Sequence, residues 1–425
     1  MTVSGIRDIL WGAPTLILLI GFGLYFTLRL GFWRPARIAE AFRLTFFGKS
    51  KKSGGGNLSS LSALATALGG TVGVGSINGV ALSISLGGAG SIFWMWICSF
   101  LGFGLKYAEV VLAHNHRKHT SRGFAGGAMY CLKDLGYKKT AFVFALICLI
   151  SAFAGGSVVQ AGAVSDIMKP IIRSDLMRAV LIGLITYMVI GGGRIRIAKF
   201  NTFALPLVSG LFIVASLGVI VSYGKYLPEV FGQIFGEAFG LRQAAGGISG
   251  AAMIRVGCVR GTFSHEAGMG SSPISYCASN EDDSHVQGLW GVTEVFIDSF
   301  VVSTLTALTL LCTKHSTPAE VFEICYGKIG EVLYYPALGI FAFAAIISWC
   351  FYGEEALAYI SKNESGYKHL FRLLVVLGAM GGAMLKEESA FAIADILGVL
   401  MMFINLFLLY KTRSDIFALA KQKRG

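Results

Sequence analysis

The sequence predicts an all-α, polytopic membrane protein, and three observations lead to that fold class. Of the 425 residues, 54% are hydrophobic and only 14% are charged. The mean hydropathy is +0.66. Apolar runs of about 20 residues, the length that a helix needs to cross a bilayer, recur along the whole chain. A soluble protein of this length would carry more charge, and a transmembrane β-barrel would show short alternating segments instead.

Apolar runs between charged, glycine-rich or proline-containing loops predict about eleven membrane spans. The predicted spans cover residues 9–29, 58–86, 91–113, 139–168, 175–192, 200–222, 246–279, 288–312, 331–360, 369–385 and 389–411. The first run lacks the basic region and the small-residue cleavage site of a signal peptide. We therefore expect it to be retained as a membrane helix.

The positive charges predict the orientation in the membrane. Lys and Arg residues gather in every second loop, at residues 33–52, 114–122, 191–199 and 411–425. These loops are expected to face the cytoplasm, which places the N-terminus outside and the C-terminus inside a plasma (inner) membrane. The same loops account for the net charge of +12. Because no basic groove is interleaved with aromatic residues, we expect no nucleic-acid partner.

No soluble domain is apparent, so we expect a single transmembrane domain over residues 1–425. Its predicted parts are an extra first helix with a cytoplasmic linker (1–57), two inverted repeats (58–222 and 246–411) and a cytoplasmic tail (412–425). Two unusual spans, the glycine-rich second and the polar seventh, occupy corresponding places in the two halves.

The second span contains the stretch ALGGTVGVGSINGVALSISLGG at residues 67–88. One interpretation is close helix packing through the GxxxG pair Gly75 and Gly79. Glycines that alternate with Thr71 and Ser76 instead favour local unwinding. Unwound backbone at membrane depth is tolerated where it is buried or lines a cavity, and its free N–H and C=O groups can bind a ligand's charged ends.

The seventh span repeats the signal with the stretch VRGTFSHEAGMGSSPIS at residues 259–275. His265 and Glu266 predict a second interruption that faces the same cavity. Pro273 lacks an N–H group and strengthens the predicted break. Arg260 either faces water in this cavity or lies in an interfacial stretch and binds nothing.

Other polar residues lie within the predicted spans and are hypotheses of function by default, with helix bridging as the alternative. They are Gln160, Asp298, Glu354, Glu355 and Asp395. Lys106 and Glu109 are expected to pair with each other near the cytoplasmic interface. Trp349 falls in the middle of a span, away from the interfacial belt of aromatic residues, which suggests a cavity wall.

The sequence gives little indication of an enzyme or of a metal site. The sequence contains no Walker A, GxSxG or HExxH stretch. The eight cysteines include no CxxC pair. His114, His116 and His119 lie in a basic loop that is typical of a solvated face. We expect no enzyme activity and no cofactor.

At these motifs the sequence resembles the alanine/glycine:cation symporters, also called the sodium:alanine symporter family, within the amino acid-polyamine-organocation superfamily. The resemblance covers nearly the whole chain. It rests on ALGGTVGVGSINGVA, GSIFWMWICSFLGFGLKYAEVVLA, GGAMYCL, GGGRIRIAK, VRGTFSHEAGMGSSPIS, VFIDSFVVSTLTAL, FAFAAIISWCFYGEEAL and ADILGVLMMFINL. It implies a LeuT-type 5+5 inverted repeat with one extra N-terminal helix, and symport of small neutral amino acids, alanine or glycine, with sodium by alternating access.

The resemblance also implies roles for individual residues. The implied substrate-binding residues are Thr71, Gly73, Gly75, Ser76, Gln160, Phe263, Ser264 and Trp349. Among them, Trp349 would limit the size of the substrate side chain. His265 and Glu266 are the candidates for ion coupling.

The chain departs from the family pattern where ions are coupled. Ser76 and His265 stand where the family commonly has asparagine, and Ala344 and Ala345 replace a Ser-Thr pair whose hydroxyls would help to bind sodium. A hard cation prefers several oxygen ligands, and methyl groups supply none. We therefore expect weakened or lost sodium coupling, with protons or passive exchange as substitutes. Histidine is the side chain whose unperturbed pKa lies closest to physiological pH, which makes His265 the candidate proton carrier.

Two other functions stay open at this point. A nutrient sensor or uncoupled exchanger would keep the binding site but lose ion coupling, and the missing Ser-Thr pair is the feature that favours it. A channel has less support because no ring-forming selectivity sequence is visible. The expected partners are a small amino acid and the lipid bilayer, and the sequence gives no oligomeric state.

Overall fold

The computed structural model describes residues 2–48, 56–121, 123–240, 250–361, 367–384 and 387–421, without the side chains of 387–389. Its helices are α1 Val3–Leu10, α2 Ala13–Leu30, α3 Pro35–Phe47, α4 Ser60–Thr71, α5 Val74–Gly87, α6 Gly90–Asn115, α7 Ala128–Asp134, α8 Lys138–Ser151, η1 Ala152–Val159, α9 Gln160–Met168, α10 Asp175–Ile190, α11 Gly193–Ser222, η2 Gly224–Tyr226, α12 Leu227–Ala238, α13 Gly250–His265, α14 Pro273–Cys277, α15 Ser284–Val295, η3 Phe296–Ser303, α16 Thr304–Thr313, α17 Pro318–Tyr326, α18 Lys328–Ser361, α19 Lys368–Gly382, α20 Glu387–Lys411 and α21 Arg413–Lys421. Strands β1 (Lys118–Thr120) and β2 (Gly123–Ala125) form a small antiparallel sheet.

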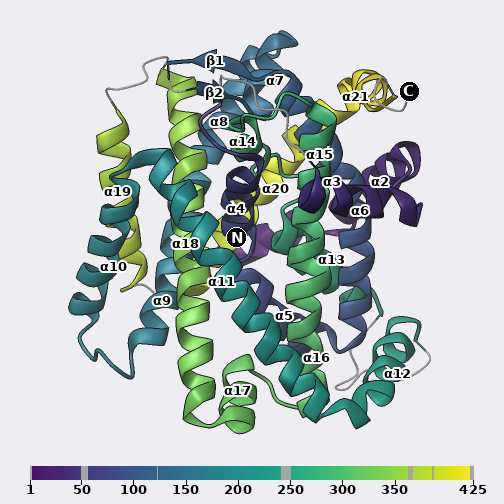
Figure 1. Ribbon diagram of the computed structural model, residues 1–425, viewed down its shortest axis with the longest axis vertical. Coiled ribbons are helices and arrows are strands. Elements are labelled where there is room, and N and C mark those ends of the chain that lie inside the picture. Colours follow the sequence, from purple (N-terminus) through teal and green to yellow (C-terminus); the bar gives the residue numbers. More distant parts are fainter. Residues whose placement is uncertain are drawn as a thin grey trace.

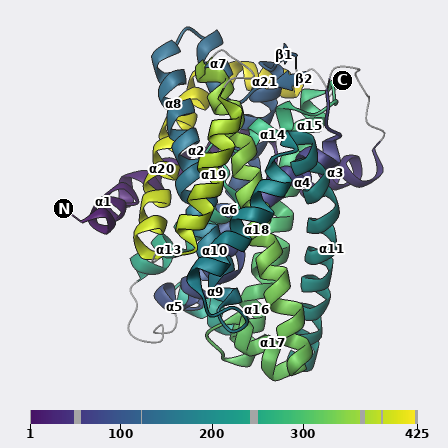
Figure 2. The same cartoon turned by 90° about the vertical axis from the view of Figure 1, so that its left-hand side faces the viewer.

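The long helices run side by side along the longest axis of the molecule (Figure 1). The β1–β2 pair, α7 and α21 gather at one end of this bundle, whereas α12 and α17 cover the other end. The short helix α1 projects from the side of the bundle (Figure 2).

The described residues contain eight helical stretches that are long and apolar enough to cross a membrane. They are Ala13–Leu30, Ser60–Gly87, Gly90–Asn115, Lys138–Met168, Gly193–Ser222, Ser284–Thr313, Lys328–Ser361 and Ala390–Lys411. The predicted all-α, polytopic class is thus confirmed. The other predicted spans correspond to the shorter helices α10 (16 residues), α13 (16 residues) and α19 (15 residues). The count of eleven spans and the 5+5 repeat stay predictions.

Two segments between the predicted spans contain helices. Residues 30–57, in the predicted cytoplasmic linker, contain α3, and residues 223–245, between the two predicted repeats, contain α12. The sixth span was predicted to begin at residue 200, but α11 already begins at Gly193. Arg194 is buried there and pairs with Glu355 at 3.4 Å, so a basic residue that looked like part of a loop is held inside the helix bundle.

The second span is interrupted, as its glycines predicted. Helix α4 ends at Thr71 and α5 begins at Val74. Between them, Gly73 has an extended backbone with φ −132° and ψ −151°. A Cβ atom on Gly75 or Gly79 would meet no atom within 4 Å. The GxxxG packing interpretation therefore has no structural support, whereas unwinding is observed.

The seventh span is interrupted between α13 and α14. The connecting residues Glu266, Gly268 and Gly270 all have positive φ angles, of 52°, 91° and 75°. Such a value is uncommon for a residue with a side chain, so Glu266 holds a conformation that the surrounding contacts must maintain. The predicted second break is confirmed.

Two π-helical stretches, η1 and η3, lie inside the membrane stretches Lys138–Met168 and Ser284–Thr313. A π-helical turn is wider than an α-helical turn, and such turns are frequent at functional sites. Gln160 begins the α-helix that follows η1, and Asp298 lies within η3. The wide turns thus help to direct these two polar side chains into the interior of the helix bundle.

Helix α2 packs against α6 at unusually close range. A Cβ atom on Gly104 of α6 would lie 2.4 Å from the backbone nitrogen of Thr27. On the other side of the contact, the Thr27 hydroxyl donates a hydrogen bond to the carbonyl of Leu101 at 3.1 Å. Small residues let helix backbones approach in a membrane, where van der Waals packing drives association. This contact fixes α2 to α6.

We predict that Gly104→Ala destabilises the protein by about 1–3 kcal/mol, because overpacking forces α2 and α6 apart. The measurement is thermal unfolding of the detergent-purified protein. The matched control is Gly21→Ala in α2, where an added Cβ meets nothing within 4 Å. Equal melting temperatures for the two variants would contradict the importance of the close contact.

Candidate functional site

A cavity of about 100 Å³ lies between the two helix interruptions. Its walls come from α4 and α5, from η1 and α9, and from α13, α18 and α20. Seven of the residues to which the family resemblance assigned a role line it together: Thr71, Gly73, Gly75, Gln160, Phe263, Glu266 and Trp349. Residues far apart in the sequence are thus brought to one small chamber.

The first interruption is held open by Gln160. Its side-chain oxygen accepts a hydrogen bond of 3.5 Å from the backbone nitrogen of Val74, the first residue of α5. A Cβ atom on Gly73 would lie 3.2 Å from the same oxygen, so a larger residue at this position would require the Gln160 side chain to shift. Gln160 therefore bridges two helices and lines the cavity at once, which combines the two alternatives that the sequence left open.

The N-terminus of α5 is directed at the cavity. Gly75 lines the cavity in the first turn of this 14-residue helix. The first N–H groups of a helix have no partner within it, and the helix dipole makes this end electropositive. The C-terminal end of α4 is the electronegative end of its own dipole, and the Thr71 carbonyl there accepts from the Gly73 nitrogen at 2.9 Å and from the Ser76 hydroxyl at 3.2 Å. The interruption can therefore receive an anionic and a cationic group side by side.

The opposite wall is aromatic. Trp349 is 9% exposed and packs against Gly156 of η1, where an added Cβ would lie 2.2 Å from the Trp349 Cβ. The neighbouring ring of Tyr352 lies 5.4 Å from the indole, nearly edge-on at 71°. Trp349 is thus fixed on both sides, as expected of a residue that limits the space for a ligand.

Charged groups also line the cavity. Arg260 from α13 and Asp395 from α20 are among the lining residues, together with Glu266. The sequence left the roles of Arg260 and Asp395 open, and in the structure both residues line the cavity. Within the described part of the chain, no salt bridge of 4.0 Å or less joins Arg260 to Asp395.

Further lining residues escaped the sequence analysis. They are Gly70, Ser151, Gly155, Val159, Met269, Phe391, Ala394 and Gly398. These residues are small or apolar and resemble ordinary membrane-helix residues. Only the packing of the helices distinguishes them from residues that face lipid.

Ser76 and Ser264 lie outside the cavity lining, although both were expected to bind substrate. Their hydroxyl groups instead donate to the carboxylate of Asp298, at 2.5 Å and 2.6 Å. The two hydroxyls are also 3.0 Å from each other. Ser303 lies 3.2 Å from Ser264, and Ser299 lies 3.1 Å from the carboxylate. We call these five residues the Asp298 cluster.

The Asp298 cluster joins both interruptions. Ser76 belongs to α5 and its hydroxyl also lies 3.2 Å from the carbonyl of Thr71, the last residue of α4. Ser264 belongs to the end of α13. Asp298, Ser76 and Ser264 are at most 2% exposed. A buried carboxylate among hydroxyl and carbonyl oxygens is the type of donor set that a hard cation prefers.

Ala344 and Ala345 of α18 are fully buried. The Cβ of Ala345 would lie 3.5 Å from a Cβ on Gly73, so this part of α18 faces the first interruption. At these two positions the helix presents methyl groups, which cannot bind a cation. The expectation that ion coupling is altered here stays a prediction.

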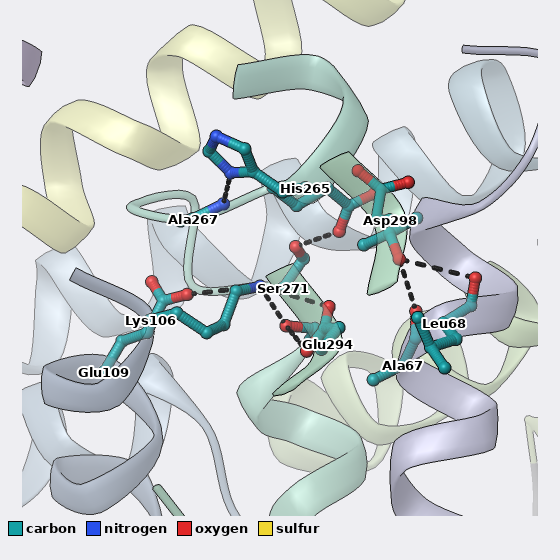
Figure 3. Close-up of polar contacts among 12 residues, drawn as sticks. Ala67, Leu68, Lys106, Glu109, His265, Ala267, Ser271, Glu294 and Asp298 are labelled. Atoms are coloured by element: carbon teal, nitrogen blue, oxygen red, sulfur yellow. Dashed lines mark hydrogen bonds and ion pairs between the residues drawn. The ribbon is translucent and has the colours of Figure 1, made fainter. Parts of the chain in front are cut away.

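A second buried polar network holds the seventh-span interruption (Figure 3). The Lys106 ammonium lies 3.2 Å from Glu294 and 3.5 Å from Glu109, and it donates to the Ser272 hydroxyl at 2.5 Å. Glu109 in turn accepts hydrogen bonds from the backbone nitrogens of Gly268 and Gly270, both at 3.1 Å. Lys106 and Glu109 do pair, as predicted, but as part of the anchor of a helix interruption.

The two coupling candidates have different surroundings. Glu266 lines the cavity and accepts a hydrogen bond from the Ser271 hydroxyl. His265 is absent from the lining, and its Nδ1 accepts a hydrogen bond of 3.0 Å from the Ala267 nitrogen. Its Nε2 has no hydrogen-bond partner among the described residues. Of the pair, Glu266 is placed to contact a ligand in the cavity.

Comparisons with known proteins agree with this architecture. A family model described as the sodium:alanine symporter family matches residues 1–422. The chain is 34% identical to the sodium/alanine symporter AgcS of Methanococcus maripaludis over 95% of this chain and 92% of that protein. It is 36% identical to an uncharacterized transporter of Haemophilus influenzae over 97% of this chain and 94% of that protein.

A solved structure shares the fold. It is the substrate-bound, outward-open state of a Na⁺-coupled sialic acid symporter, with a TM-score of 0.55 and 12% identity over 95% of this chain and 88% of that chain. The prediction of a transporter, and not an enzyme, is confirmed by the family match and by the related sodium/alanine symporter. This protein, a multi-pass membrane protein with a polar cavity between two interrupted helices, belongs to the sodium:alanine symporter family.

Proposed function

We propose that the protein is a secondary active transporter that moves a small neutral amino acid, alanine or glycine, together with sodium by alternating access. The observation that carries this proposal is the cavity at the first helix interruption, where the ends of α4 and α5 face the same space. Family membership and the name of the related sodium/alanine symporter support the choice of substrate and ion.

In the proposed complex, the substrate carboxylate lies at the N-terminus of α5, near Gly75. The ammonium group lies toward the carbonyl groups at the end of α4, near Thr71. The substrate side chain then points at the apolar wall that contains Val159, Phe263 and Trp349. Because Trp349 is fixed against Gly156, a small side chain fits this space better than a large one.

The Asp298 cluster is the proposed site for the coupling cation. Its carboxylate lies next to hydroxyl oxygens from both interrupted helices, and hard cations favour such oxygen ligands. Ser76 lies in α5 immediately after Gly75, so a cation in the cluster and a substrate in the cavity would order the same turn of helix. This shared segment supports coupling despite the alanines at 344 and 345.

The first test of this proposal is transport in proteoliposomes. We expect an inward sodium gradient to drive accumulation of labelled alanine above equilibrium, with unlabelled alanine and glycine as competitors. Parallel vesicles with a proton gradient, and with no gradient, identify the coupling ion. Uptake that does not depend on the sodium gradient would contradict sodium symport. Saturable binding without net flux would favour a sensor.

The second test is Asp298→Asn, which removes the charge of the proposed cation site while it keeps the size of the side chain. Charge-assisted contacts contribute about 1.5–3 kcal/mol, so the sodium concentration for half-maximal uptake should rise at least about tenfold. The control is Asp166→Asn, because Asp166 is 49% exposed and pairs with Lys169. A half-maximal sodium concentration like that of the parent protein would place the cation elsewhere.

A further inference from the structure

Trp11 lies outside both predicted repeats, in the turn between α1 and α2, yet it reaches the wall of the substrate cavity. Its side chain is buried, with the residue 2% exposed. The indole Nε1 donates a hydrogen bond of 3.2 Å to the backbone carbonyl of Asp395 in α20. The indole ring lies 5.2 Å from the ring of Phe263 in α13, at 49°. Both Phe263 and Asp395 line the cavity.

The ring of Phe263 has neighbours in both Trp11 and α20. A Cβ atom on Gly398 of α20 would lie 3.4 Å from the Phe263 ring, at ordinary contact distance. The indole of Trp11 packs against the same ring. An aromatic ring with two packed neighbours keeps one orientation, and this orientation sets the shape of the cavity wall.

The position of Trp11 is itself fixed by the segment that carries it. Its backbone nitrogen donates to the carbonyl of Arg7, which closes α1, and α2 begins two residues later. Asp8 of α1 pairs with Arg255 of α13 at 2.9 Å, and α1 also packs against α20. The exposed ion pair contributes little energy. The buried indole, with its apolar area and its hydrogen bond, is the main contact of this segment with the cavity wall.

We propose that Trp11 is a positioning residue for the substrate cavity: by holding Phe263 and the backbone at Asp395, the N-terminal segment sets the affinity for the transported amino acid. The proposal rests on the proposed function, because affinity is measured for the amino acid that the protein transports. Trp11 does not line the cavity. Its effect must therefore pass through the two residues that it contacts.

The test measures KM and the maximal uptake rate per folded protein in proteoliposomes. Trp11→Ala removes one aromatic contact and one buried hydrogen bond, so KM should rise about fivefold to tenfold. The maximal rate should stay within about twofold, since the residue does not touch the substrate. Trp11→Phe keeps a ring against Phe263 but loses the hydrogen bond to the Asp395 carbonyl, so its KM should lie between those of the parent protein and of Trp11→Ala. Trp33→Ala, at a residue that is 52% exposed, is the matched control and should leave KM unchanged.

A double-mutant cycle with Phe263→Leu tests whether Trp11 acts on KM through Phe263. The cycle uses only the conservative Trp11→Phe change, so it can be measured even where Trp11→Ala does not fold. The KM effect of Trp11→Phe should shrink or vanish in the Phe263→Leu background. Unchanged KM in both Trp11 variants, or an effect that is fully additive with Phe263→Leu, would overturn the proposal. Absence of uptake by the parent protein would instead refute the proposed function, so the two failures are distinguishable.

Discussion

The structure depends on one constraint: in a bilayer, every backbone N–H and C=O group must find a partner or face a polar cavity. Both interruptions meet this constraint with side chains from neighbouring helices. Gln160 accepts from the backbone of Val74 at the first break. Glu109 accepts from Gly268 and Gly270 at the second. Gly75, in the first turn of α5, lines the cavity, where a ligand can bond to backbone groups at the helix end.

The anchor of the second interruption is costly and specific. Lys106 is a single ammonium shared by two buried carboxylates, Glu109 and Glu294. Burial of such charges is unfavourable unless their contacts are complete, and removal of one partner leaves an uncompensated charge. The gain is a fixed geometry for the loop that carries Glu266 into the cavity. Charged residues in the spans thus hold backbone groups in position as much as they contact a ligand directly.

The sequence predicted the helical class, both interruptions and most of the cavity, because glycine, proline and charge at membrane depth are informative. It placed Ser76 and Ser264 with the substrate, whereas their hydroxyls bond Asp298. That distinction depends on which face of a broken helix each residue occupies. Trp11 carried no signal, since its partner Asp395 is 384 positions away. Small lining residues and the early start of α11 likewise depend on packing between helices.

The central claim is that the interruption between α4 and α5 holds the charged ends of an amino acid. The most direct measurement is an experimental structure determined with sodium and alanine at saturating concentrations. The account predicts ligand density between the residues of 71–75, Gln160 and Trp349, with the carboxylate at the N-terminus of α5. Ligand density at another place, or a continuous helix through residues 72 and 73, would contradict it.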